Sequence, residues 1–361
     1  MTSMETIVRE LENYRGPEIK LMEVCGTHTA SIFKNGIRDL ISPQIRLISG
    51  PGCPVCVTPA GYIDAAVEAA QKPGHVLLTF GDMMKVPGSR LSLSQSRAEG
   101  ARVEVMYSPQ EAVKRAKQEP DKTFVVAAIG FETTIPAYCQ VLSSIRSEKI
   151  ENICLHTALR RIIPALQWIA DNEAAIDGYI CPGHVSAIIG EDVYRPLAAR
   201  IKKPMAIAGF TAEHILAAIY DLVKQLAGDR AEVHNLYPSV VSKEGNVQAL
   251  EAINRCFRPG TARWRGLGDI VDSGYYLREE FAPFDAGHGR WEKEETLEEG
   301  GCRCGEVIIG RVTPPRCALF GTACTPLSPR GPCMVSAEGA CGIWYKYRLN
   351  DGINDRNGVS G

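Results

Sequence analysis

Between residues 19 and 208, apolar runs of strand length recur along the chain, and each is followed by a Gly- or Pro-bearing turn and a helix-like segment. Strands that alternate with helical segments indicate βαβ units and largely parallel sheets. Eight such runs suit either a closed eight-stranded barrel or two α/β domains of about four strands each. The polar stretch 114–122, which contains Pro120, favours the two-domain interpretation. The runs are 19–24, 45–48, 75–80, 102–107, 123–129, 152–156, 178–180 and 204–208.

The length of the chain and a change of pattern near Leu236 indicate a further division. A chain of 361 residues exceeds what one hydrophobic core usually serves. After Leu236 the segments are rich in aromatic residues and Gly and less regular, and the acidic stretch 289–301 is typical of a solvated linker or exposed helix. We therefore expect a first α/β domain, a second α/β domain, and a Cys-rich domain on which the N-terminal residues can pack: 21–118, 119–229, and 230–361 with 1–20.

Composition argues against several classes of protein. The formal net charge of −2 argues against a nucleic-acid binder, which needs a concentrated basic face. The charged, amphipathic start of the chain is unlike a signal peptide, and no stretch has the apolar length of a membrane helix. We therefore expect a cytoplasmic protein without membrane association. In that compartment thiols stay reduced, and many cysteines indicate metal or redox chemistry.

The thirteen cysteines are unevenly distributed. Three lie near the start, in CGTHT and GPGCPVC, four are scattered through the middle, and six crowd between Cys302 and Cys341. That last stretch has many Pro and Gly residues and few periodic runs, so it cannot build a conventional core, and a bound cluster would replace one. The distribution indicates one metal cluster and a second, separate thiol site.

Unusual residues stand where the expected strands end. Ligands of open α/β sheets bind outside the carboxyl ends of the strands, so these turns are expected to converge on one cleft. The turns are CGTHT, GPGCPVC, TFGDMM, GFETT, CPGHVS and AGFTAEH.

Cys53 and Cys56 have the CxxC spacing of a reversible dithiol. At a helix start such a pair can close a disulfide, and the helix dipole lowers the pKa of the thiol. The same spacing also suits half of a zinc or iron site. Gly50 and Gly52 permit a backbone conformation that other residues resist. The redox and the metal-binding interpretations both stay open.

Four more residues are candidates, and each has a structural alternative. Cys25 and His28 can supply a thiol and an imidazole to a site. In the alternative interpretation, Cys25 is a buried structural cysteine beside a capping threonine. Glu132 in GFETT is a candidate acid, base or ligand, although a glutamate in a first helical turn is also favourable for the dipole. His184 is a candidate ligand or proton carrier, or a histidine that is hydrogen-bonded within its turn.

The C-terminal cysteines give the strongest metal signal. They offer six thiols, where a four-iron four-sulfur cluster needs four. Zinc sites usually draw on two closely spaced pairs, whereas the only close pair here is Cys302 and Cys304. Wide spacing suits a cubane, but spacing alone does not choose four ligands from six.

In this order, CGTHT, GPGCPVC, GFETT, PGHVS and the Cys-rich tail make the chain resemble the HypD family, the maturation factors of nickel–iron hydrogenases. The resemblance runs from about Glu23 to Tyr347. It implies two similar parallel-sheet α/β domains and a third, Cys-rich domain that carries a 4Fe–4S cluster. One turn departs from it, because GFTAEHIL stands where an acidic GFE-type turn is expected. The cluster ligands that it implies are Cys302, Cys317, Cys324 and Cys341, which leaves out Cys304 and Cys333.

The activity that the resemblance implies is assembly rather than independent turnover. Members serve as a scaffold on which iron acquires two cyanides and one carbon monoxide, together with a HypC-type chaperone and with HypE, which delivers cyanide downstream of HypF. The chain would then be a monomer within a hetero-complex. Cys25 would help to hold the iron, and Cys53 and Cys56 would be a dithiol coupled to the cluster. The other candidate site residues are His28, Glu132 and His184.

Two other functions compete with this hypothesis. A stand-alone iron–sulfur-dependent thiol/disulfide oxidoreductase would turn over a small disulfide without a chaperone. A zinc-stabilised binding protein would contain zinc and no iron.

Overall fold

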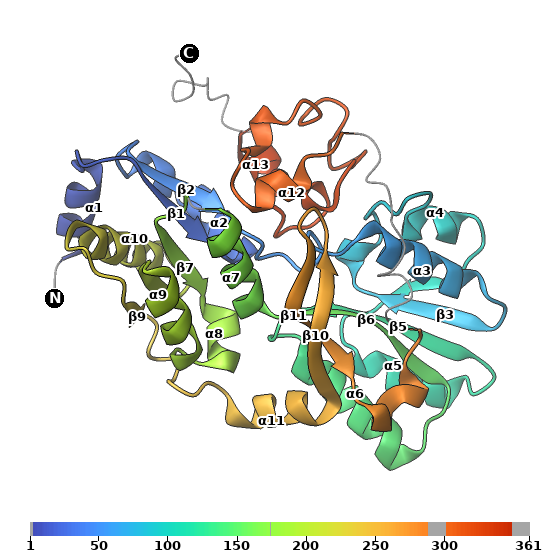
Figure 1. Cartoon of the computed structure of the whole chain (residues 1–361). Coiled ribbons are helices and arrows are strands. Elements are labelled where there is room, and N and C mark those ends of the chain that lie inside the picture. Colours follow the sequence, from blue (N-terminus) through green and yellow to red (C-terminus); the bar gives the residue numbers. More distant parts are fainter. Residues whose placement is uncertain (1–2, 174, 288–300, 349–361) are drawn as a thin grey trace.

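The computed structural model describes residues 3–173, 175–287 and 301–348. Two β-sheets flanked by helices lie side by side, and the Cys-rich segment sits over the seam between them (Figure 1). The acidic stretch 289–301 lies outside the described residues apart from Gly301, as does 349–361 of the expected third domain. The α/β class and the presence of a separate Cys-rich region are confirmed, and two open sheets replace the barrel alternative.

The first sheet is parallel throughout, with the strand order β2-β1-β7-β8-β9. Its central strands are apolar on both faces, as expected of a parallel sheet that helices cover on each side. Its strands are β1 (Ile19–Glu23), β2 (Ile45–Ser49), β7 (Gly178–Pro182), β8 (Met205–Ala208) and β9 (Val233–Asn235).

The second sheet has the order β10-β11-β6-β5-β3-β4. Strands β3 to β6 are parallel, and the β10–β11 hairpin extends this sheet with antiparallel pairing. Its strands are β3 (His75–Thr79), β4 (Val103–Val105), β5 (Thr123–Gly130), β6 (Ile153–Arg160), β10 (Phe257–Trp264) and β11 (Gly268–Leu277).

All eight expected strands are present, but they are not shared between the sheets as expected. Strands β1 and β2 belong to the first sheet, β3 to β6 to the second, and β7 to β9 to the first again. The boundary expected at residues 118 and 119 therefore falls inside the second sheet. The polar stretch that suggested it is largely helix α5 (Gln110–Gln118), whose buried face is Ala112, Val113 and Ala116. Its charged residues are the solvent face of an amphipathic helix and not a linker.

Helices cover both faces of each sheet, and three hydrophobic cores result. One core packs α1, α2 and α10 on the first sheet, and another packs α5, α6 and α11 on the second. The third lies between the sheets and includes side chains of α3, α7 and α9. The remaining bounds are α1 Met4–Glu12, α2 Gly26–Lys34, α3 Ala60–Gln71, α4 Leu93–Ala98, α6 Ile135–Glu148, α7 Ile162–Asn172, α8 Gly183–Ile189, α9 Arg195–Ile201, α10 Ala212–Ala227, α11 Val247–Cys256, α12 Cys304–Ile308 and α13 Ala340–Arg348.

Strand β5 shows how its sequence serves two of these cores. Successive side chains of a strand point to opposite faces. Val125, Ala127 and Ile129 accordingly enter the central core, while the alternate residues of β5 enter the core against α5 and α6. The continuous apolar run in the sequence is therefore explained by burial on both faces.

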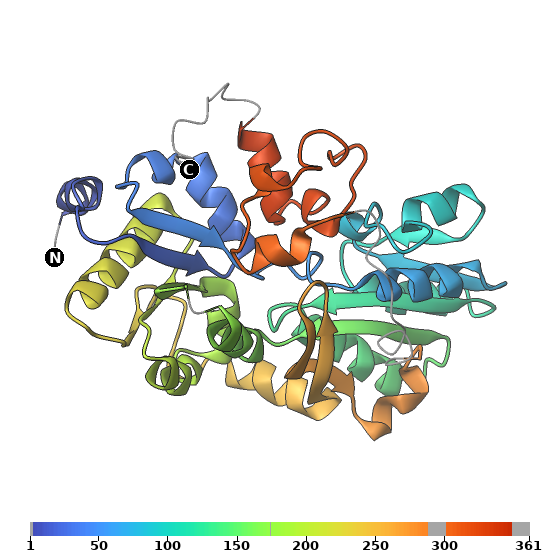
Figure 2. The ribbon, with the colours of Figure 1, turned by 45° about the horizontal axis from the view of Figure 1, so that its top comes forward.

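The Cys-rich segment contacts the ends of strands from both sheets (Figure 2). A Cβ on Gly26, at the start of α2, would lie 2.3 Å from the Glu338 carbonyl oxygen, so these backbones touch. Beyond the end of β3, Asp82 accepts a 3.0 Å hydrogen bond from Ser336. The segment therefore spans the seam and shares the central core, to which Cys304, Cys324, Cys333 and Cys341 belong.

The N-terminal residues pack elsewhere than expected. Helix α1 lies on α10 of the first sheet, with Ile7 and Leu11 in the core that the two helices share, instead of on the Cys-rich segment. Its apolar stripe matches the apolar face of α10, which is why it docks there. No helix in the described part of the chain is long and apolar enough to cross a membrane.

Candidate functional site

Two of the Cys-bearing turns touch each other at the seam. Cys25 follows β1 and stands at the N-cap of α2 in an extended conformation, with its side chain buried. A Cβ on Gly52 would lie 2.4 Å from both the nitrogen and the Cα of Cys25. Only glycine allows this approach, because no other residue leaves the position free of side-chain atoms. GPGCPVC is thus held directly against CGTHT.

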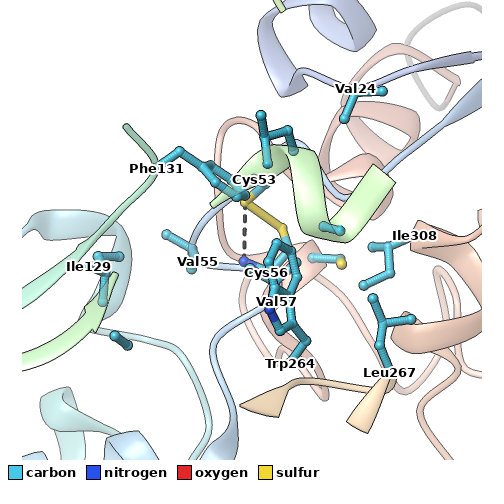
Figure 3. Close-up of a cluster of buried hydrophobic side chains, with 14 of the residues drawn as sticks. Val24, Cys53, Val55, Cys56, Val57, Ile129, Phe131, Trp264, Leu267 and Ile308 are labelled. Carbon is cyan, nitrogen blue, oxygen red and sulfur yellow. Dashed lines mark hydrogen bonds between the residues drawn. A yellow bond between two sulfur atoms is a disulfide. The ribbon is translucent and has the colours of Figure 1, made fainter. Parts of the chain in front are cut away.

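Cys53 and Cys56 form a disulfide with their Cα atoms 5.3 Å apart (Figure 3). Both residues are buried, and Phe131 and Val57 are among the side chains drawn around them. The two sulfurs are thus close enough to bond, as the dithiol interpretation of the CxxC spacing requires.

The dithiol does not stand in a first helical turn, as its spacing suggested. Helix α3 begins only at Ala60, after the N-cap Pro59, and residues 53–57 form a tight turn in which Cys56 N–H donates to the Cys53 carbonyl at 3.1 Å. The same N–H lies 3.2 Å from Cys53 Sγ. A local backbone donor, in place of the helix dipole, therefore faces the sulfur that would become a thiolate on reduction.

Burial dominates the acid–base properties of Cys25 and its neighbour Glu23. It raises the pKa of the Cys25 thiol to about 11, and the negative charge of Glu338 adds to this shift. It also raises the pKa of Glu23 to about 8, although Thr29 Oγ1 donates to its carboxyl and Cys25 N–H approaches it at 3.4 Å. A cation bound at Cys25 would displace the thiol proton next to a carboxyl that is itself protonated near neutral pH.

His28 and His184 are brought together by a residue that the motifs did not single out. Phe210, in the turn after β8, lies between them, with ring centroids 4.9 Å from His28 and 4.0 Å from His184. His28 is fully buried, its Nε2 is 3.0 Å from the Gly209 carbonyl, and burial lowers its pKa to about 4. His184 is exposed at the start of α8. Only His184 is therefore placed to reach a molecule from solution.

Glu132 is buried at the end of β5, before the helix that follows it, so the first-turn interpretation does not apply. Its Oε1 accepts a 3.0 Å hydrogen bond from Ile162 N–H at the start of α7, whereas Oε2 is buried without a hydrogen-bond partner in the structure. Burial raises the pKa of Glu132 to about 7. A carboxyl of this kind is poised to exchange a proton near neutral pH.

A buried tyrosine lies between the motifs. Tyr194 shares a 2.9 Å hydrogen bond with Ser186 of the CPGHVS turn. Burial raises the pKa of Tyr194 well above its usual value, and Cys181, Glu132 and Cys25 add to that shift by their charge. These groups therefore share one region, to which the CGTHT, GFETT and CPGHVS turns all contribute. Neither Tyr194 nor Glu23 was among the sequence candidates.

The Cys-rich segment forms a pocket at the other side of the same core. All four expected ligands line it, and Cys304 does so as well: the thiols are Cys302, Cys304, Cys317, Cys324 and Cys341. Cys302 Sγ and Cys304 Sγ are 3.1 Å apart. A Cβ on Gly331 would lie 2.4 Å from Cys304 Sγ and 2.5 Å from Cys302 Sγ, so glycine leaves the space that these sulfurs occupy.

The thiols of the pocket are also linked to one another. The hydrogen bond between Cys302 and Cys304 raises the pKa of Cys302 and lowers that of Cys304. Cys333 is fully buried, and interactions with the thiols of Cys304 and Cys341, together with burial, raise its pKa well above the ordinary value. Geometry thus places Cys304 in the lining of the pocket, which spacing did not assign, whereas Cys333 is buried in the core beside it.

The ligand atoms that the pocket offers indicate which kinds of metal centre it could hold. Within 3–173, 175–287 and 301–348, no cluster of three or more His, Cys, Asp or Glu residues is arranged to hold a single metal ion. The five thiols around one pocket are nevertheless ligands of the kind that the irons of an iron–sulfur cluster take, and a four-cysteine zinc site uses the same ligands.

The chain is similar in sequence to several known proteins. Residues 2–348 match the family model HypD, described as the hydrogenase formation hypA family. A putative hydrogenase expression/formation protein of Methanocaldococcus jannaschii is 43% identical over 336 residues, which cover 92% of this chain and 92% of that protein. The hydrogenase maturation factor HypD of Azotobacter vinelandii is 43% identical over 339 residues (91% and 89%). That of Escherichia coli K12 is 41% identical over 339 residues (92% and 90%).

Proposed function

The chain belongs to the HypD family and has a role in hydrogenase maturation, and within that role we propose that it is the scaffold on which an iron ion acquires two cyanides and one carbon monoxide. The relatives' role implies a maturation complex. The proposed partners in it are a HypC-type chaperone, which helps to hold the iron, and HypE, which supplies cyanide with HypF upstream. The reducing cytoplasm is the proposed location, because it suits the many free thiols.

The observation that carries this proposal is the contact between Cys25 and the disulfide turn. Because Gly52 lies against the Cys25 backbone, a metal on Cys25 Sγ would be next to a group that takes up or gives up two electrons. Thiolate is a soft ligand and suits iron that also binds cyanide and carbon monoxide. Cys25 is the proposed iron ligand from this chain, and the burial that raises its pKa to about 11 means that iron must displace a proton to bind.

The surrounding residues have proposed roles that follow from where they lie. His184 is exposed on the Phe210 face and can contact an incoming partner or ligand. His28, which is buried and neutral, positions the turn after β8 through its contact with the Gly209 carbonyl. Glu132, with a pKa of about 7 and a buried Oε2 that lacks a hydrogen-bond partner, is the proposed proton reservoir.

The cysteine pocket is the proposed site of a 4Fe–4S cluster, held by Cys302, Cys317, Cys324 and Cys341. Such a cluster would supply electrons one at a time. The chain's own disulfide needs two electrons and two protons to become the dithiol of Cys53 and Cys56. Transfer of a cyano group from a thiocyanate on a partner also consumes electrons, which this dithiol can provide.

The stand-alone oxidoreductase has less support. Cys53 is 4% exposed and Cys56 is 2% exposed, so a dissolved disulfide substrate has little access to either sulfur. Attack by or on a thiol requires such access. A site enclosed between Cys25 and the central core suits a captive metal better than a diffusing substrate.

Infrared spectroscopy of the anaerobically purified protein with its small chaperone partner tests the scaffold proposal. We expect bands in the stretching regions of cyanide and carbon monoxide bound to iron. Co-purification under conditions that support hydrogenase maturation, with no such bands, would contradict the proposal.

Cysteine variants test the assignment of roles. Cys25→Ala, Cys53→Ala and Cys56→Ala are each expected to abolish hydrogenase maturation while the iron–sulfur absorbance of the protein is retained. The matched control is Cys154→Ala, whose thiol lies on β6 and donates to the Phe124 carbonyl at 3.8 Å. Normal maturation by all three site variants would overturn the assignment.

A further inference from the structure

The tip of the β10–β11 hairpin lies between the disulfide turn and the cysteine pocket. On one side, Arg265 N–H donates a 2.9 Å hydrogen bond to the carbonyl of Val57, the residue after Cys56. On the other, a Cβ on Gly266 would lie 2.3 Å from the Cα of Gly305, the residue after Cys304. The hairpin tip thus contacts residues next to both sulfur sites: Val57 beside the disulfide and Gly305 beside the cysteine pocket. The hairpin reaches up to α12 in Figure 1.

The side chains of the tip continue this connection. Trp264 is buried beside Val57, and Leu267 faces Ile308 of α12 (Figure 3). The Trp264 ring packs on Phe131 at 5.9 Å between centroids, and its Nε1 donates to Ser273 Oγ at 2.7 Å, which fixes the ring within the hairpin. The tip is therefore rigid and packed on both sides.

Arg265 also brings a charge to the pocket. It is buried, with only 8% of its surface exposed, in the tip that lies against Gly305, beside the paired thiols of Cys302 and Cys304. A guanidinium is always protonated and cannot lose its charge on burial. It therefore acts as a fixed positive charge beside any anionic group that these thiols hold.

We propose that the hairpin tip is the coupling element between the disulfide and the cysteine pocket, and that Arg265 is a positioning residue that sets how readily the centre in that pocket accepts an electron. This inference rests on the proposed function, because it takes an iron–sulfur centre to be held there. None of the sequence motifs contains these residues.

Reduction of the disulfide needs twice as many electrons as the centre in the pocket passes in one step. Reduction breaks the Cys53–Cys56 bond and needs two electrons and two protons, whereas the centre passes one electron at a time. A low-potential one-electron donor must therefore recharge the centre between the two transfers. Each electron adds a negative charge at the pocket, and the fixed charge of Arg265 stabilises that state.

The first test measures the reduction potential of the centre by an anaerobic redox titration followed by electron paramagnetic resonance. Arg265→Gln is expected to make reduction about tenfold less favourable, which is about 59 mV for a one-electron couple. Arg265→Lys retains the charge and is expected to restore most of the potential. The matched control is Arg263→Gln on the same hairpin, whose side chain pairs with Asp269 at 2.8 Å and is expected to leave the potential unchanged.

The second test measures how fast electrons reach the disulfide. Photoreduced deazaflavin serves as the one-electron donor, and new thiols at Cys53 and Cys56 are trapped by alkylation and counted by mass spectrometry. Gly266→Ala is expected to lose the fast phase of thiol formation, because its Cβ would displace the tip from Gly305. Gly268→Ala is the control: it has the same left-handed backbone, with φ of 81° against 72°, but nothing lies within 4 Å of its Cβ.

The outcomes separate this inference from the function on which it rests. If wild-type protein holds an iron–sulfur centre but Arg265→Gln and Arg263→Gln have the same potential as wild type, the role of Arg265 is wrong and the scaffold proposal stands. Equal rates of thiol formation in the two glycine variants would likewise overturn the coupling role of the tip. If wild-type protein reconstituted with iron and sulfide holds no centre, both proposals fail.

Discussion

At the scale of single residues, the site is defined by ionisable groups that the fold removes from water. Glu23, Cys25 and Glu132 are all buried at strand ends, and burial raises the pKa of each. Desolvation penalises the charged form, so each group holds its proton more firmly than it would in solution. The site is thus proton-rich before any metal binds, and ligand binding must be coupled to proton release.

Glu132 makes this coupling measurable in the stability of the protein. Its pKa rises from the ordinary 4.5 to about 7, so between these values the folded chain keeps a proton that the unfolded chain has lost. The contribution of Glu132 to stability therefore falls as the pH rises through that window. Glu132→Gln cannot ionise and keeps an oxygen for Ile162 N–H, so it is expected to remove this fall, which amounts to about 3 kcal/mol at most.

Urea unfolding near pH 5 and pH 7 compares the two proteins. The exposed Glu68→Gln is the control and is expected to follow the wild-type pH dependence. A Glu132→Gln protein whose free energy of unfolding also falls like that of wild type would show that Glu132 is not the buried acid described.

Sequence reasoning found the cysteines of the site and three of its ionisable residues, but not the other side chains between them. Cys25, Cys53 and Cys56 stand out because thiols beside glycines are rare. Tyr194 and Phe210 resemble ordinary core residues, and only the tertiary structure places them between motifs. Glu23 did carry a signal, since a carboxylate that follows the apolar Leu21 and Met22 at the end of a strand is costly to bury unless it is protonated or paired.

At the scale of elements, the contact between two turns depends on one glycine. A Cβ on Gly52 would lie 2.4 Å from the Cys25 backbone, so Gly52→Ala must push the two turns apart. We expect a loss of about 1–3 kcal/mol in the free energy of unfolding, as for other overpacked sites, and a loss of hydrogenase maturation. Chemical denaturation and the maturation assay check the two effects.

The control for this prediction is Gly81→Ala. Gly81 also lies in a turn after a strand, but the nearest atom to its Cβ would be Val105 Cγ1 at 3.9 Å, an ordinary contact. It is expected to change neither measurement. Equal stability of the Gly52→Ala and Gly81→Ala proteins would mean that the turns are not in tight contact.

The elements themselves were largely predictable where their patterns are local. Each of the eight apolar runs is a strand, because β-structure buried on both faces requires such runs. The β10–β11 hairpin was not foreseen: FRPGTARW contains Pro, Gly and two arginines, which are uncommon in strands. Its position at the end of the sheet, where it pairs with β6 through β11 only, tolerates them.

At the scale of the whole molecule, the arrangement of the strands could not be read from the sequence. The chain forms β1 and β2 of the first sheet, then β3 to β6 of the second sheet, and then β7 to β9 of the first sheet. Apolar periodicity determines the type of an element but not its partner, so the pattern alone predicts that consecutive segments form separate domains. The crossing has a functional consequence, because it brings turns from both sheets to one seam.

The Cys-rich segment closes that seam, and metal should determine how firmly it does so. Within the described residues it has only short helices, and it contacts α2 through the Phe33 and Trp344 rings at 4.9 Å and through Thr27 and Glu338 at 3.1 Å. A segment with so little regular structure would gain stability from the proposed cluster. We therefore expect removal of iron by an anaerobic chelator to speed amide hydrogen exchange in residues 304–345 and at the start of α2.

The same experiment contains its own reference. Strand β5 is buried between two cores and is expected to keep its slow exchange after iron is removed. Cys324→Ala, which removes one proposed ligand, should reproduce the exchange of the chelated protein even when iron is supplied, whereas Cys154→Ala should not. Unchanged exchange in 304–345 after chelation would mean that packing on α2 alone holds the segment across the two sheets, and that the pocket thiols have no part in closing the seam.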